Sequence, residues 1–181
     1  MRPALELTSV PRWAVTVTNP DADLSGRHWT VVAVGPDTGD VVARWSDQIA
    51  RHRGLAAVRV HRVDDDEAAR AAVDRDMAGA VVGWRLMMAG PADACLRLRA
   101  HALAAGVSDD EITVASTDVA DRDVRCVHCD AVTSTSAALE DVVGCAGCGR
   151  SLLVYYHVSR RLGAHLGFMI DAEEPAQAEA S

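Results

Sequence analysis

The sequence has 181 residues, 49% of them hydrophobic but only 4% aromatic, so it fits one domain, or one domain plus a small module, whose core is built mainly from Ala, Val and Leu. Its formal net charge of −8 argues against a nucleic-acid-binding protein, because binding of nucleic acid needs a basic face. No apolar run is long enough for a membrane span and no signal-peptide pattern opens the chain, so we expect a cytoplasmic protein with no membrane partner.

The predicted elements alternate between apolar strands and helices. Residues 13–17 predict a short buried strand, followed by a turn at 19–23. The pattern then predicts strands at 29–34, 56–63, 80–88 and 111–116, and helices at 41–53, 65–77 and 91–105, with Asp40 as a possible N-cap of the first helix. Apolar strands that alternate with helices indicate βα units, which form a parallel sheet covered on both faces.

The composition changes near residues 118–123, where an acidic stretch separates this pattern from a cysteine-containing segment. We therefore predict an α/β domain over residues 1–119 and a four-cysteine module with an aromatic and basic segment over 120–170. The last residues, 171–181, are rich in Ala and Glu and are predicted to be a flexible tail.

Four cysteines follow the predicted boundary with the spacing C-x2-C-x15-C-x2-C: Cys126, Cys129, Cys145 and Cys148. A tight C-x-x-C turn places two sulfur atoms on one side of the backbone, and two such turns complete a tetrahedron around one metal ion. In the cytosol, cysteine pairs favour metal binding over disulfides. The four cysteines are therefore predicted metal ligands.

Zinc is the predicted metal, with a rubredoxin-like single iron as the alternative, because both ions accept four thiolates. The spacing of a [2Fe–2S] ferredoxin or Rieske protein is absent. Four protein ligands leave no open position for water, so the predicted zinc is structural. Gly144, Gly147 and Gly149 suit the second turn, whereas the first turn has no glycine and matches less ideally. His128, inside the first turn, is expected to be an exposed bystander.

The segment from 151 to 168 holds both tyrosines, the only phenylalanine, two histidines and a paired arginine. Aromatic residues are scarce elsewhere, and Tyr and Arg are typical anchors of protein interfaces, so a partner interface is favoured over packing around the metal module. No nucleophile or carboxylate is recognisable beside His157 or His165, and no catalytic residue is predicted. Cys95, on the apolar face of a predicted helix, is expected to be a small buried hydrophobe rather than a reactive thiol.

Two loops follow predicted strands at the position where open sheets bind phosphate. The first is G-P-D-T-G over 35–39, and the second is Gly90-Pro91. The glycine spacing is not G-x-G-x-x-G, so a plain turn is favoured over a nucleotide loop. Gly35, Gly39, Gly90 and Pro91 are nevertheless the candidate cofactor-binding residues.

The C-terminal third resembles the small accessory subunit of bacterial dimethylamine monooxygenase, the DmmA-like family. The strings that carry the resemblance are C-V-H-C, G-C-A-G-C-G-R, L-L-V-Y-Y-H-V-S-R-R-L-G-A-H-L-G-F and D-A-E-E. That family oxidises a secondary methylamine with reduced pyridine nucleotide and dioxygen, and its heme, flavin and iron–sulfur cluster lie on partner subunits. The resemblance implies a non-catalytic subunit whose partners are the oxygenase and reductase chains.

The N-terminal part is more loosely similar to the nucleotide-binding domain of ferredoxin reductases of the phthalate dioxygenase reductase type. Residues 29–36 resemble their first strand and glycine loop, and residues 86–93 with 103–107 resemble their C-G-P motif, helix and G-V turn. Ala89 stands where that motif has cysteine. The resemblance implies a degenerate, parallel-sheet reductase-like scaffold in which a zinc ribbon takes the place of the ferredoxin.

The sequence therefore predicts a structural or docking subunit of a multicomponent amine monooxygenase complex. The alternative is an electron-transfer component that holds rubredoxin-like iron or binds NAD(P)H or flavin. A general zinc-ribbon adaptor for other proteins is a third interpretation.

Overall fold

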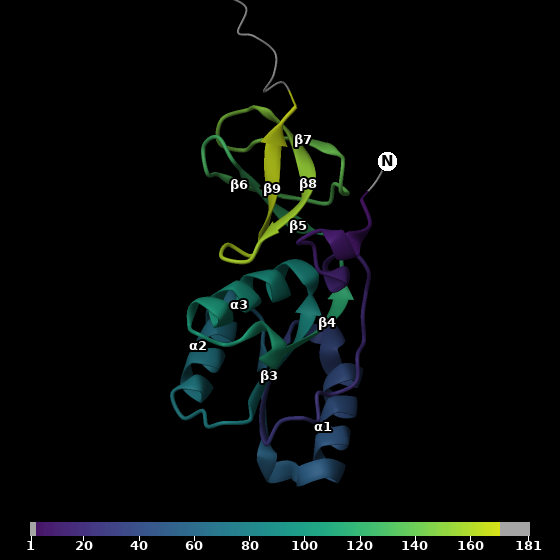
Figure 1. Ribbon diagram of the computed structural model, residues 1–181, viewed down its shortest axis with the longest axis vertical. Helices are drawn as coiled ribbons and strands as arrows, with labels where there is room; N and C mark the ends of the chain where they lie inside the picture. The colour runs from purple at the N-terminus through teal and green to yellow at the C-terminus, as the bar shows by residue number, and fades with distance from the viewer. Residues whose placement is uncertain (1–2, 171–181) are drawn as a thin grey trace, which may run out of the picture.

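The computed structural model describes residues 3–170, and the predicted tail at 171–181 lies outside them. Two sheets succeed one another along the chain (Figure 1). The elements of the first part are β1 (His28–Val34), α1 (Gly39–Arg53), β2 (Val58–Val63), α2 (Asp66–Met77), β3 (Trp84–Pro91), α3 (Ala92–Ala104) and β4 (Ile112–Asp118). The second part contains β5 (Arg122–Cys126), β6 (Val132–Thr135), β7 (Val142–Gly144), β8 (Ser151–Ser159) and β9 (Ala164–Met169).

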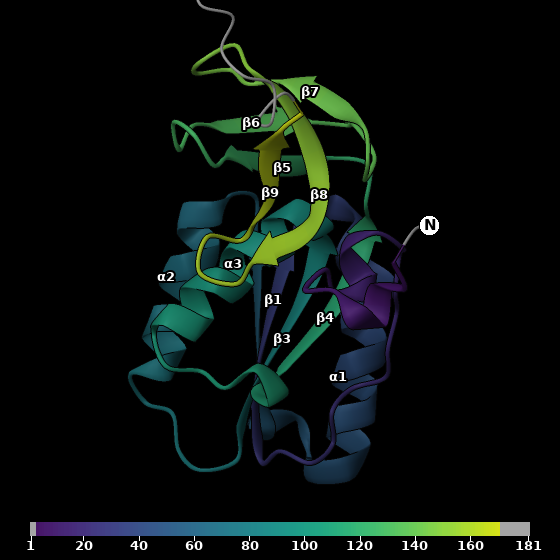
Figure 2. The ribbon, with the colours of Figure 1, turned by 45° about the horizontal axis from the view of Figure 1, so that its top comes forward.

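The first sheet is parallel throughout, with the order β2-β1-β3-β4, which confirms the predicted α/β class. Alternate residues of β1 face opposite sides, as the period of a strand requires. Val32 packs in a cluster with residues of α2 and α3, whereas Val31 packs in a second cluster with Trp45 and Ile49 of α1. Figure 2 shows the sheet between α1 on one side and α2 with α3 on the other.

The predicted strand at 13–17 is wrong. A 3-10 turn at Arg12–Ala14 follows Pro11. The apolar residues of this N-terminal arm pack in a hydrophobic cluster and do not form a β-strand. Ala14 is buried while Val17 is exposed. The arm (residues 3–18) pairs with the sheet through an isolated antiparallel bridge between Thr18 and Ser116 of β4.

Several element boundaries also differ from the prediction. The third strand starts at Trp84 instead of residue 80, because Gly83 turns the chain with φ +92° and its carbonyl accepts the N–H of Arg27. Asp40 lies inside the first turn of α1 and is not its N-cap. Asp65 caps α2, accepting the N–H of Ala68 at 2.8 Å.

The second sheet has the order β6-β5-β9-β8-β7 and is antiparallel except for the pairing of β5 with β9. Its ladder is interrupted in β8 between Val154 and Val158. The β8–β9 hairpin reaches toward α3 of the first part (Figure 1).

A close contact joins the two parts at the turn of this hairpin. Gly163 has φ +65°, and a Cβ on it would lie 2.5 Å from the carbonyl oxygen of Leu96 in α3. Beside it, Arg97 pairs with Asp123 of β5 at 2.7 Å and with Asp66 and Asp93 of the first part. Only glycine permits this approach, so the turn presses directly on the helix backbone.

Candidate metal centre

The first C-x-x-C turn begins where β5 ends, at Cys126. The N–H of Asp130 donates to the carbonyl of Cys126 at 3.0 Å, and the N–H of Cys126 donates to the carbonyl of Ala131 at 2.9 Å. These two bonds close the turn and hold Cys129 above it.

The second turn follows β7 and repeats the same bonds at the same spacing. The N–H of Gly149 donates to the carbonyl of Cys145 at 3.0 Å, and the N–H of Cys145 donates to the carbonyl of Arg150 at 2.8 Å. The two turns are therefore congruent knuckles, although their sequences share only the cysteines.

The two knuckles share their shape because the residue four positions after the first cysteine of each has a left-handed backbone conformation. Gly149 has φ +72° in the second knuckle, and Asp130 has φ +65° in the first. Asp is among the residues that tolerate this conformation, and Arg125 pairs with its carboxylate at 2.7 Å. The first knuckle lacks a glycine, as noted from the sequence, and Asp130 takes the place that Gly149 has in the second. An alignment of C-x-x-C-D with C-x-x-C-G would have revealed this correspondence.

The four sulfur atoms lie within 4.8 Å of one another. The Cys126 and Cys148 sulfurs are 3.8 Å apart, and those of Cys129 and Cys145 are 3.5 Å apart. A tetrahedron with metal–sulfur bonds of about 2.3 Å separates its sulfurs by roughly 3.8 Å. All four thiols are free of disulfides. This donor set can hold one metal ion.

Gly147 allows the two knuckles to meet. A Cβ at this position would lie 2.6 Å from the Cβ of Ala131 and 3.2 Å from the sulfur of Cys129. Its N–H also points at the sulfur of Cys145, at 3.4 Å. The glycine is thus required for close approach and not for an unusual φ.

The thiols differ in their tendency to ionise. Backbone N–H groups of Cys148 and Gly147 lower the pKa of Cys145 to about 6. The backbone N–H of Ala131 lowers the pKa of Cys129 in the same way. Desolvation and the neighbouring thiols outweigh this effect and raise the pKa of Cys129 to about 12. A bound cation would favour four thiolates together, since it supplies the opposite charge that crowded sulfurs lack.

The site lies at the edge of the second part's small core. Cys126 and Cys145 are buried against Val124, Leu152 and Val154, whereas Cys129 is exposed. His128 is exposed as well, and it is not part of the four-residue metal cluster.

The predicted cofactor-binding glycines lie at the carboxyl ends of β1 and β3. Gly35 follows β1 with φ +79°, and a Cβ on Gly90 would lie 2.9 Å from the carbonyl oxygen of Val34. The chain order reverses between these two strands, which is where open sheets bind ligands. Pro91 ends β3, and Gly39 starts α1, where Asp37 and Asp40 would oppose a phosphate.

The aromatic segment has one exposed and one buried face. Tyr155 and Phe168 form an edge-to-face pair with ring centres 5.2 Å apart, and both rings are exposed. His165 is buried, and its burial together with the charge of Arg122 lowers its pKa to about 4. His157 lies in the interrupted part of β8.

Cys95 is buried in the core beside α2 and β3, as expected for a small hydrophobe. Burial, with the charge of Asp93, raises the pKa of this thiol to about 12. The thiol is therefore protonated at neutral pH and unreactive.

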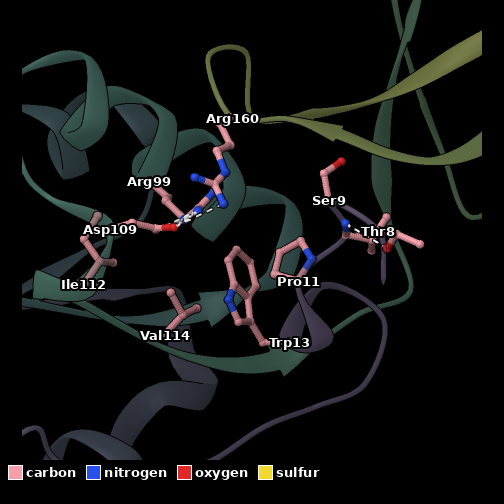
Figure 3. A pocket seen from close by; sticks show the side chains of 10 residues that line it. Thr8, Ser9, Pro11, Trp13, Arg99, Asp109, Ile112, Val114 and Arg160 are labelled. Carbon is pink, nitrogen blue, oxygen red and sulfur yellow. Dashed lines mark hydrogen bonds and ion pairs between the residues drawn. The ribbon is translucent and has the colours of Figure 1, made fainter. Parts of the chain in front are cut away.

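A cavity of about 300 Å³ between the N-terminal arm, α3, β4 and the β8–β9 turn has no counterpart among the sequence predictions (Figure 3). Arg99 makes a bidentate ion pair with Asp109, at 2.8 and 2.6 Å, and Arg160 approaches the same carboxylate at 3.7 Å. The charges of this cavity are thus paired within the chain.

A family model matches the second part of the chain. Residues 123–168 match the family model of the dimethylamine monooxygenase subunit DmmA-like C-terminal domain. The resemblance of the C-terminal part to the DmmA-like family is confirmed. The matched residues thus include both knuckles and the aromatic segment.

A curated relative is the heme-dependent oxidative N-demethylase delta subunit of Ectopseudomonas mendocina (strain ymp), 42% identical over 96 residues. The match covers 53% of this chain and 54% of the relative, so the chain spans about half the length of that protein. No solved structure matches the chain. Over the described residues, none of the helices combines the length and apolar character needed to cross a membrane.

Proposed function

We propose that this chain is a non-catalytic accessory subunit of a multicomponent amine monooxygenase of the dimethylamine type. The proposal is supported by the DmmA-like domain and by the relative that is the delta subunit of an oxidative N-demethylase. Heme, flavin and an iron–sulfur cluster would be carried by the oxygenase and reductase chains with which it assembles in the cytoplasm.

The observation that carries the proposal is the cluster of four cysteine sulfurs that two congruent knuckles bring together. The four cysteines would hold a structural zinc ion, because the protein fills every position of a tetrahedral site. Zinc would supply on the order of 10 kcal/mol to a module with little core of its own. The module would be a zinc ribbon over residues 120–170, following a reductase-like domain over 1–119.

The docking surface would lie on the outer face of the ribbon. Val142, Leu153 and Phe168 pair side by side across β7, β8 and β9, so their side chains share one face of the sheet. Tyr155 adds its ring to that of Phe168. Exposed aromatic side chains grouped in this way are typical of the centre of an interface.

Metal analysis and co-purification test the proposal. The purified chain is expected to contain one zinc per chain and to be colourless, and oxygenase and reductase subunits are expected to co-purify with it. The double variant Tyr155→Ser with Phe168→Ser should lose these partners. Val82→Ser, which removes an exposed apolar side chain from the first part, is the matched control and should keep them.

An absence of stoichiometric zinc would refute the structural role. Retention of the partners by the double variant would refute the docking face, and a wild-type chain that never enriches these subunits would refute the assembly.

A second candidate is a rubredoxin-like electron carrier, favoured by the exposure of Cys129, because a redox metal needs a short path to the surface. Ferric iron in four thiolates absorbs visible light, whereas zinc does not. A yellow chromophore would instead indicate flavin in the crevice beside Gly35 and Gly90.

A further inference from the structure

Arg122 of β5 is a buried arginine that forms no ion pair with the other residues of the described range 3–170. It is 8% exposed, and one Nη donates to the carbonyl of Val119 at 3.2 Å. Its Nε is buried and has no hydrogen-bond partner. Within residues 3–170, the ion pairs closer than 4.0 Å do not include Arg122. Buried charges are normally paired, so this guanidinium needs an explanation.

The other buried arginine, Arg99, shows what the fold does elsewhere. Asp109 accepts two hydrogen bonds from it, and Figure 3 shows Arg160 turned toward the same carboxylate. The described part of the chain thus provides a paired carboxylate for Arg99 and none within ion-pair distance of Arg122.

Arg122 lines a cavity of about 470 Å³ between the N-terminal arm and the second part of the chain. The cavity walls come from both sides and expose somewhat more apolar than polar surface. The residues that form them include Leu5, Val15, Ala138, Leu139 and Tyr156. A guanidinium at an apolar wall suits a ligand with an anionic head and an apolar body, because Arg binds planar carboxylates through two parallel hydrogen bonds.

Nearby groups of the chain do not take this role. Asp141 lines the same cavity, but one of its carboxylate oxygens accepts the N–H of Ala138 at 2.8 Å, and no ion pair within 4.0 Å joins it to Arg122. Burial lowers the pKa of Arg122 below its usual value, although the negative charges of Asp141 and Asp121 act to raise it. Arg122 thus lines this cavity and keeps a buried Nε–H that has no hydrogen-bond partner among the described residues.

We propose that this cavity binds a carboxylate carried on a short apolar stem, with the Arg122 guanidinium as its cationic partner. The carboxylate belongs either to a small organic acid or to an acidic side chain of a partner subunit. The site is independent of the metal centre and of the outer face of the ribbon.

Titration with butyrate tests the site, with butyramide as a neutral control of similar shape. Butyrate is expected to bind and to shift the NMR signal of the Arg122 Nε–H, whereas butyramide leaves it unchanged. Arg122→Met should weaken butyrate binding at least tenfold, and Arg122→Lys should weaken it less. Arg160→Met, in the cavity with paired charges, should bind butyrate like the wild type.

Failure of butyrate to shift the Arg122 signal in the wild-type chain would overturn the proposal, and so would equal affinity in Arg122→Met. The wild-type titration does not depend on the folding of any variant. If butyrate also displaces the co-purifying oxygenase or reductase subunits, the natural carboxylate is a side chain of the partner. If butyrate binds without displacing them, it is a small acid.

Discussion

The two parts of the chain differ in what stabilises each of them internally. The parallel sheet buries fourteen residues in one cluster and eleven in the other, on its two faces. The cluster around the knuckles buries only five residues, and two of these are the cysteines Cys126 and Cys145. A small core of this kind rarely stabilises a module alone, so we expect the stability of the second part to depend on a bound metal ion and that of the first part not to.

Loss of the metal should have the largest effect, and it should unfold the second part while the first part stays folded. Cys145→Ser removes one ligand and should unfold the second part, since on the order of 10 kcal/mol of binding energy is lost. Hydrogen exchange should then show β5–β9 unprotected while β1, β3 and β4 stay protected.

Cys95→Ala, in the core of the first part, is the matched control for cysteine removal. It should keep its metal content and lose about 1–2 kcal/mol of unfolding free energy. Equal protection of both sheets in Cys145→Ser would contradict the division.

Acid should weaken the second part through His165. The pKa of this residue is about 4 in the folded chain, because burial and then the charge of Arg122 disfavour its protonation. It is about 6.5 when unfolded. The unfolded chain therefore binds more protons between these values, so stability is complete above pH 6.5 and is lost as the pH falls toward 4. The full loss is about 3 kcal/mol, of which about 1.4 kcal/mol occurs by pH 5.5.

Urea unfolding at pH 7.5 and 5.5 measures this loss, with metal content followed in parallel. His165→Leu should show a smaller difference between the two pH values than the wild type. The same pH dependence in both proteins would assign the acid effect to other groups.

The junction between the parts should respond to Gly163→Ala. The new Cβ would meet the carbonyl oxygen of Leu96 at 2.5 Å, and φ is +65°. The expected cost is about 2 kcal/mol of unfolding free energy, with faster hydrogen exchange in α3 beside the turn.

Gly79→Ala has open space and no positive φ, so it controls for the loss of a glycine. If both variants lose the same stability, the turn does not press on α3.

The α/β class and the cysteine pattern could be predicted because each depends on local order. Apolar runs such as 29–34 identify buried strands, and the spacing of the four cysteines limits their geometry. Residues 13–17 misled for the same reason: their apolar character matches a strand, but Pro11 and the packing of Ala14 place them in a turn. An apolar sequence pattern does not distinguish a β-strand of a sheet from an irregular segment that packs against the sheet.

The cavities and unpaired charges could not be predicted, because they join residues far apart in the chain. Arg122 meets Leu5 and Val15 only after the N-terminal arm returns to the second part. Asp109 meets Arg160 across some fifty positions. Such contacts depend on the placement of whole elements, which no local pattern contains.

Asp130 gives the smallest expected effect and sharpens the comparison between the two knuckles. If Asp130 and Gly149 play the same part, Asp130→Gly should leave metal affinity and stability unchanged, because glycine adopts φ +65° freely. Asp130→Val places a β-branched residue in the left-handed region and should cost about 1 kcal/mol. Loss of the pair with Arg125 contributes little, since the Asp130 side chain is 73% exposed. Thermal unfolding of both variants measures the difference. A destabilised Asp130→Gly would mean that the carboxylate, and not the backbone conformation, is what the first knuckle requires.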